Sequence, residues 1–228
     1  GAEKLVFVTG SSKRAIEDHF DSNVELERSL EEAGKTKLLE SIRAIVPSEA
    51  TCIYIRQSEP LGLGHAVLCA RPVVGDEPFA VHLADDLIQA ETPCLKQMAD
   101  VFESTGGSVL AVQPVPRDET EKYGVVDVEP LSEGLGSVRA IVEKPKPADA
   151  PSNLGVVGRY ILTPRIFDLI RATSTGTGGE IQLTDAIALL LEEQPVSAYQ
   201  FDGTRYDCGS KMGYLKATVE LALAHETL

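Results

Sequence analysis

The stretch Phe79-Ala80-Val81-His82-Leu83-Ala84-Asp85-Asp86 carries the clearest fold signal in this chain. Its first five residues are typical of a buried strand, and two carboxylates follow almost at once. Carboxylates at the end of a buried strand are costly unless they are solvated, paired or bound to a cation. In an open α/β sheet, ligands bind outside the carboxyl ends of the strands. The stretch therefore predicts a strand and a ligand site at its end, although an N-cap role for the acids stays open.

Strands and helices alternate on both sides of this stretch, up to about residue 113. Such an order implies crossover connections and a mostly parallel sheet covered by helices on both faces. Beyond residue 120, strands separated by short turns suggest antiparallel additions. We therefore expect one α/β domain over residues 1–228. The expected strands cover 5–9, 52–55, 79–83, 108–113, 125–128, 138–142, 156–162 and 198–201, and the main expected helices 38–45, 65–71, 93–103, 164–172, 183–192 and 211–225.

The first expected strand lies almost at residue 1. A buried parallel strand needs neighbours on both sides. Leu5–Thr9 is therefore either an edge strand or the neighbour of a segment that precedes it in a longer protein.

Composition excludes several classes of function. The chain has 35 acidic and 21 basic residues, a net charge of −14, which disfavours general nucleic-acid binding. Its four cysteines form no C-x-x-C pair, so we expect no zinc site and a reducing compartment. No apolar run approaches the roughly 18 residues of a membrane helix. We expect a cytoplasmic protein that binds neither nucleic acid nor membrane.

Three further segments are candidate ligand sites. Gln57–Ala66 follows an expected strand and contains Gly62 and Gly64. The two glycines would let the backbone approach a flat ligand closely, or they could simply belong to an ordinary strand–helix loop. Glu143-Lys144-Pro145 ends another strand and could bind a sugar hydroxyl and a phosphate, or form a surface ion pair. Asp207 precedes the last helix, either as a second metal ligand or as that helix's N-terminal acid.

The order of these signals resembles one enzyme family along essentially the whole chain. The motifs are Val8-Thr9-Gly10, Gly-Leu-Gly-His-Ala-Val (62–67), Leu-Ala-Asp-Asp (83–86), Tyr-Gly-Val-Val (123–126), Glu-Lys-Pro (143–145), Asn-Leu-Gly-Val-Val-Gly-Arg-Tyr (153–160), Gly-Glu-Ile-Gln-Leu-Thr-Asp-Ala (179–186) and Tyr-Asp-Cys-Gly (206–209). The family that they resemble is that of the bacterial UTP–glucose-1-phosphate uridylyltransferases. This resemblance implies a Rossmann-like nucleotidyltransferase fold, an α/β three-layer sandwich with a mixed, mostly parallel sheet.

The resemblance also implies an activity and its partners. UTP and glucose 1-phosphate would give UDP-glucose and pyrophosphate, with Mg²⁺ as the cofactor and a homodimer or homotetramer as the assembly. By matching position, Gln57 and Gly62 would contact uracil, while Asp85 and Asp207 would hold the metal. The glucosyl phosphate would bind Gly124, Glu143 and Lys144, and Glu180 would lie near the sugar or a subunit contact. Lys144 and Asp85 would be the catalytic residues.

The sequence departs from the family at its start. The resemblance implies a preceding strand and a Gly-rich loop that holds the triphosphate, and neither lies within these residues. We expect the 228-residue domain, incomplete at its N-terminus, to turn over poorly by itself. A thymidylyl-, cytidylyl- or adenylyltransferase, or a non-catalytic sugar-nucleotide-binding protein, is the alternative.

Overall fold

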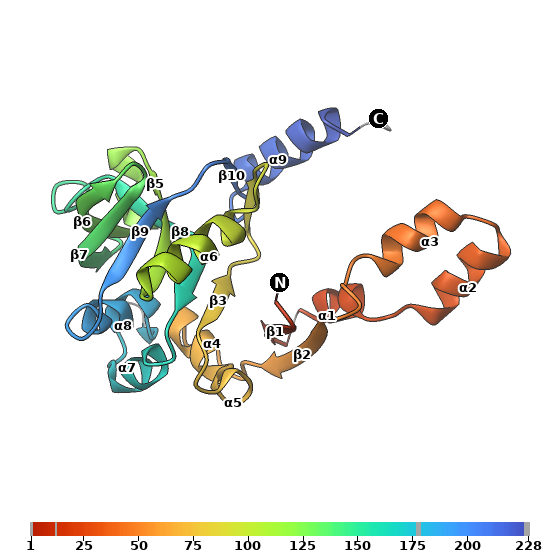
Figure 1. The fold of residues 1–228 in the computed structure, drawn as a ribbon, viewed down its shortest axis with the longest axis horizontal. Helices are drawn as coiled ribbons and strands as arrows, with labels where there is room; N and C mark the ends of the chain where they lie inside the picture. Colours follow the sequence, from red (N-terminus) through yellow and green to blue (C-terminus); the bar gives the residue numbers. More distant parts are fainter. Residues whose placement is uncertain (1, 12, 177–178, 226–228) are drawn as a thin grey trace.

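A six-stranded mixed sheet forms the centre of the computed structural model, which describes residues 2–11, 13–176 and 179–225 (Figure 1). The strand order is β3-β8-β5-β9-β7-β6. The strands are β3 (Phe79–His82), β5 (Ser108–Pro114), β6 (Gly124–Ser132), β7 (Leu135–Glu143), β8 (Leu154–Leu162) and β9 (Val196–Gln200).

The α/β class and the mixed sheet are confirmed, but the expectation of mostly parallel pairing is wrong for the described strands. In this sheet β5 and β9 pair in parallel, whereas β3–β8, β5–β8, β7–β9, β6–β7 and β6–β8 are antiparallel. The physical reason is the position of β8. Strand β8 lies between β3 and β5, which share one direction, and it runs antiparallel to both of them. The β6–β7 hairpin turns at Gly134, whose φ of 72° suits glycine.

Helices cover both faces of this sheet. Along β5, Leu110 and Val112 belong to one buried cluster, while Val109 and Ala111 belong to another. Side chains alternate across a strand, so the apolar run of β5 fills two cores at once. The first core contains α4 (Leu63–Cys69), α7 (Ile166–Ala172) and α8 (Leu183–Leu190), and the second contains α6 (Cys94–Thr105). The expected three-layer sandwich is confirmed.

Two smaller sheets lie beside the central one. Strands β1 (Lys4–Thr9) and β2 (Thr51–Arg56) pair in parallel, so among the described strands β1 has a single neighbour and is an edge. Strands β4 (Asp86–Gln89) and β10 (Thr204–Asp207) pair antiparallel. The second pair was not predicted, and it positions the acidic residues of the candidate site.

Some of the remaining helices project from this body. In Figure 1, α2 and α3 form a hairpin that projects away from the six-stranded sheet, and α9 projects elsewhere with Ala217 as its one buried residue. No described helix is both long and apolar enough to cross a membrane. All four cysteines are free. The helices outside the two cores described above are α1 (Arg14–Phe20), α2 (Val24–Glu32), α3 (Thr36–Arg43), α5 (Arg71–Val74), the 3₁₀ helix η1 (Arg117–Lys122) and α9 (Lys211–Leu223).

The larger core predicts a sharp contrast between two leucines. Leu190 in α8 is 0% exposed, whereas Leu131 in β6 is 60% exposed. We expect Leu190→Ala to lower the free energy of unfolding by about 3 kcal/mol, because it removes buried methyl groups and leaves a cavity. Leu131→Ala should cost about 0.5 kcal/mol or less. Urea unfolding measures both, and equal losses would contradict the assigned core.

Candidate functional site

The β4–β10 pair brings two acidic residues to one point. Asp207 lies opposite Asp86 in the register, and Cys208 N donates to Asp85 O at 2.7 Å. A methyl group added at Gly209 would lie 3.0 Å from Asp85 Oδ2 and 3.1 Å from Asp207 Oδ1. The carboxylates of Asp85 and Asp207 therefore converge beside Gly209, although they are more than 120 residues apart in sequence.

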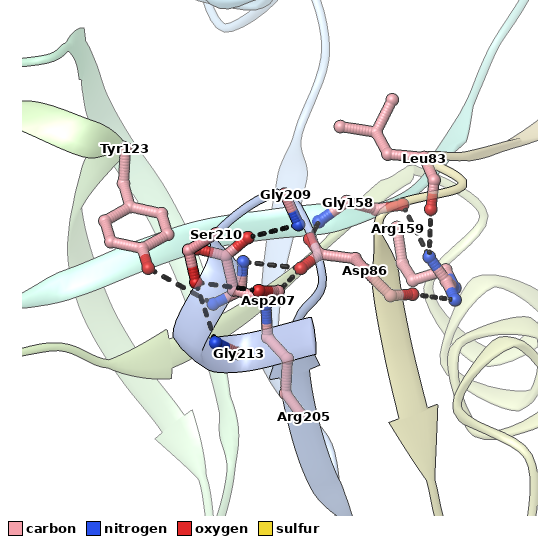
Figure 2. Close-up of polar contacts among 10 residues, drawn as sticks. All are labelled: Leu83, Asp86, Tyr123, Gly158, Arg159, Arg205, Asp207, Gly209, Ser210 and Gly213. Atoms are coloured by element: carbon pink, nitrogen blue, oxygen red, sulfur yellow. Dashed lines mark hydrogen bonds and ion pairs between the residues drawn. The ribbon is translucent and has the colours of Figure 1, made fainter. Parts of the chain in front are cut away.

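Asp207 does not serve as the cap of the last helix. The N-cap of α9 is Ser210, whose Oγ accepts from Gly213 N at 3.0 Å (Figure 2). Asp207 Oδ1 accepts instead from Gly209 N at 3.1 Å, within its own turn. Ser210 therefore caps α9, and the Asp207 carboxylate is held within its own turn.

Asp86 is buried in a network of charged partners, unlike the exposed Asp85 beside it. Its Oδ1 lies 2.5 Å from the guanidinium of Arg205, and the two side chains are only 6% and 8% exposed. Its Oδ2 accepts from Gly158 N. A methyl group at Gly158 would clash with Asp86 Oδ2 at 2.6 Å, so the glycine lets β8 approach this closely. Asp86 begins a strand and is therefore not a helix N-cap, and both of its carboxylate oxygens have partners within the protein.

The Asp86–Arg205 ion pair offsets a repulsion between two carboxylates that the strand register brings together. Asp86 and Asp207 face each other directly, and like charges opposite one another destabilise a sheet. Arg205 lies two residues before Asp207, on the same face of β10, and neutralises Asp86 from the diagonal position. Arg205 also donates to Tyr123 Oη at 3.2 Å. Burial lowers the pKa of Arg205, but its hydrogen bonds and charges from Tyr123 and Asp86 outweigh burial, so the pKa is raised.

A second arginine fixes the backbone on the other side of Asp85. Arg159 donates to Leu83 O at 3.2 Å and to Asp86 O at 2.6 Å (Figure 2). Burial lowers the pKa of Arg159. The segment that carries Asp85 is thus held from both ends, while its own carboxylate remains exposed.

One cleft of about 290 Å³ gathers most of the predicted site residues. A larger hollow of about 520 Å³ beside α6 and β9 contains none of them. Gln57 and Gly62 do not line the cleft, but Gly62 adjoins it, because a methyl group there would lie 2.8 Å from Glu180 Cβ. The predicted residues that line the cleft are Asp85, Gly124, Glu143, Lys144, Glu180 and Asp207.

A second group of residues that line the cleft is built around Glu143. Thr184 Oγ1 donates to Glu143 Oε2 at 2.9 Å, and Lys144 Nζ lies 3.2 Å from Glu143 Oε1. A methyl group at Gly124 would lie 2.7 Å from Thr184 Cγ2. The carboxylate of Glu143 is thus oriented by two neighbours, and Gly124 leaves room beside it. The predicted surface ion pair exists, and it lies in the cleft.

Lys144 has a strained backbone. Its φ of 45° is the one positive value among the described non-glycine residues, and Pro145 follows it. Left-handed backbone costs an L-residue roughly 1–2 kcal/mol, and a following proline restricts the residue further. Lys144 N donates to Tyr123 O at 2.9 Å, which holds the turn in place. Strain of this kind gathers at functional sites.

The paired carboxylates suit a divalent cation that also binds a substrate. The described residues contain no group of three or more acidic, histidine or cysteine side chains arranged around a common point. Mg²⁺ commonly takes one or two carboxylates together with substrate phosphates and water. Asp85 and Asp207 supply such an incomplete set, and their donors fit the cation.

Sequence reasoning missed Arg205, Thr184 and Tyr123. A period-two reading of Thr204–Asp207 would have placed Arg205 on the face of Asp207. Thr184 stands within a quoted motif, but nothing in that motif indicated its contact with Glu143. Tyr123 also stands within a quoted motif, but its contact with Arg205, 82 residues away in sequence, follows only from the fold.

Comparison with known proteins gives one consistent picture. A family described as "Nucleotidyl transferase" matches residues 5–223. A relative named UTP–glucose-1-phosphate uridylyltransferase, from Bacillus subtilis (strain 168), is 54% identical over 230 residues, covering 100% of this chain and 78% of the relative.

Two solved structures agree with this relative. A crystal structure of apo UDP-glucose pyrophosphorylase has a TM-score of 0.91 and 43% identity, covering 97% of this chain and 82% of its own. A structure titled as UDP-glucose pyrophosphorylase complexed with UDP-glucose has a TM-score of 0.88 and 42% identity, covering 98% and 82%.

The backbone at Lys144 gives a stability prediction that is separate from catalysis. Lys144→Gly and Lys144→Ala both remove the ammonium group, but only glycine adopts φ of 45° freely. We expect the glycine variant to unfold with a free energy about 1 kcal/mol higher than the alanine variant. Chemical denaturation compares them, and an alanine variant as stable as the glycine variant would show that the turn is not strained.

Proposed function

The chain belongs to the nucleotidyl transferase family, and from this membership we propose that its cleft forms UDP-glucose and pyrophosphate from UTP and glucose 1-phosphate. The single observation that carries the proposal is the cleft itself, which gathers Asp85, Asp207 and the adjacent pair Glu143-Lys144 from three separate segments. We propose that residues 1–228 act as one nucleotidyltransferase domain, in the cytoplasm, as a homodimer or homotetramer.

The reaction joins two anions. A phosphate oxygen of glucose 1-phosphate attacks the α-phosphorus of UTP, a new P–O bond forms, and the bond to pyrophosphate breaks. The negative charges of the two phosphates oppose this approach, so the work of the site is positioning and neutralisation. A net charge of −14 means that the chain as a whole does not attract these substrates, and local cations must do so.

Each side of the cleft has its own task in this proposal. Asp85 and Asp207 would hold Mg²⁺, which supplies charge neutralisation to the phosphates when bound. Lys144 would neutralise the attacking phosphate. Glu143, oriented by Thr184, would accept hydrogen bonds from sugar hydroxyls. Gly124 would leave space for the sugar phosphate, and Glu180, which lines the cleft, would lie near the sugar or a subunit contact.

The base would bind at the loop between β2 and α4. Gln57 directly follows β2, and Gly62, with φ of 98°, directly precedes α4. Gly64 N donates to Ile181 O at 2.9 Å, which seats the loop against the segment that carries Glu180. Gln57 and Gly62 would therefore contact uracil from a position next to the sugar.

A side-by-side assay tests this function. The full-length protein that contains residues 1–228 is incubated with glucose 1-phosphate, Mg²⁺ and UTP, dTTP, CTP or ATP, because residues 1–228 by themselves are expected to turn over poorly. Nucleotide sugar is measured by chromatography. We expect UDP-glucose as the main product. A main product from another nucleotide would assign a different branch of the family. Binding of UDP-glucose without any turnover would instead indicate a non-catalytic binding protein.

The same assay tests the two acids. Asp85→Asn and Asp207→Asn should each lower kcat/KM at least about 100-fold, because each removes a charged cation ligand. Asp76→Asn is the matched control, since Asp76 is exposed and does not line the cleft. Wild-type activity in either site variant would exclude that residue from the proposed site.

A further inference from the structure

His65 contacts the residue that we propose reads the base. His65 Nδ1 lies 3.0 Å from Gln57 Nε2, one turn into α4. The same amide nitrogen donates to Gly62 O at 3.1 Å. Both residues are half-buried, so the contacts are partly shielded from water.

The hydrogen-bond chemistry of this group has one consistent solution. A backbone carbonyl can only accept, so the Gln57 atom that faces Gly62 O must be the NH₂ nitrogen. That nitrogen can only donate, so His65 Nδ1 must accept from it. The proton of the neutral imidazole then lies on Nε2, which faces the sulfur of Cys69 at 3.9 Å. Every partner in the chain Gly62–Gln57–His65–Cys69 has a compatible role.

The Gln57 amide therefore has one group left. Both of its N–H bonds are directed at acceptors, and the described residues provide no recorded partner for Oε1. Flipping the amide would set its oxygen against Gly62 O, and it would require His65 to move its proton from Nε2 to Nδ1. The side chain is thus locked to offer an acceptor and not a donor.

We propose that His65 is a specificity-determining residue, which locks the Gln57 amide so that the site accepts a hydrogen bond from the base. This inference rests on the proposed function, because it needs the base to bind at Gln57. Uracil offers a donor at N3–H, whereas cytosine presents an acceptor at N3. A locked Oε1 favours uracil and meets the cytosine N3 as lone pair against lone pair. His65 acts through Gln57 and does not itself contact the base.

The preference of the full-length protein that contains residues 1–228 for UTP over CTP tests the role of His65. His65→Ala should lower the ratio of kcat/KM for UTP to that for CTP about tenfold or more, since the amide then keeps only its bond to Gly62 O and can rotate more easily toward either base. The KM for glucose 1-phosphate should not change. His65→Asn, whose side-chain oxygen can replace Nδ1 as acceptor, should restore most of the preference. A loss that was merely structural would lower both nucleotides equally and would not be rescued by asparagine.

Binding separates this inference from the proposed function. Calorimetry with UDP-glucose and CDP-glucose gives the base preference even without turnover. A wild-type chain that binds UDP-glucose and makes none contradicts the proposed function alone. A folded His65→Ala variant that keeps the wild-type preference for UDP-glucose over CDP-glucose overturns the role of His65.

Discussion

The buried ion pair between Asp86 and Arg205 is the constraint on which the candidate site depends. It joins β4 to β10 at the point where Asp86 and Asp207 face each other, and neither side chain of the pair is more than 8% exposed. Removing one partner of a buried ion pair leaves the other charge buried and uncompensated. This destabilises the fold far more than the loss of an exposed ion pair does. A buried ion pair therefore lies directly beside the exposed carboxylate of Asp85.

The pair also connects the two sides of the cleft. Arg205 reaches Tyr123 Oη, and the backbone oxygen of Tyr123 accepts from Lys144 N. The aspartate side and the Glu143–Lys144 side are thus linked through one arginine and one tyrosine. In the proposed reaction both phosphates must meet at a fixed distance, so a link of this kind positions the two halves against each other.

Much of this arrangement follows from the sequence, and the rest depends on long-range pairing. The apolar run at residues 108–113 predicts a strand buried on both faces, and β5 fulfils this through its alternating residues. The acids after β3 likewise indicate a ligand site. The sheet direction was misjudged because β8, distant in sequence, lies between β3 and β5. The β4–β10 pair was not predicted because four-residue strands show little periodicity. Without this strand pair, neither the contacts of Arg205 nor the role of Asp86 can be inferred.

The central claim is that the buried ion pair positions the cation site. Mn²⁺ binding, monitored by the loss of the EPR signal of free Mn²⁺, tests this claim. The account predicts that Arg205→Met, verified as folded by circular dichroism, binds Mn²⁺ at least about tenfold more weakly than wild type. Arg205→Lys, which keeps the charge without the planar fork, should lie between them and covers the case in which the methionine variant does not fold. Arg139→Met is the matched control, since Arg139 pairs with Glu129 at an exposed position. Wild-type Mn²⁺ affinity in a folded Arg205→Met variant would contradict the account.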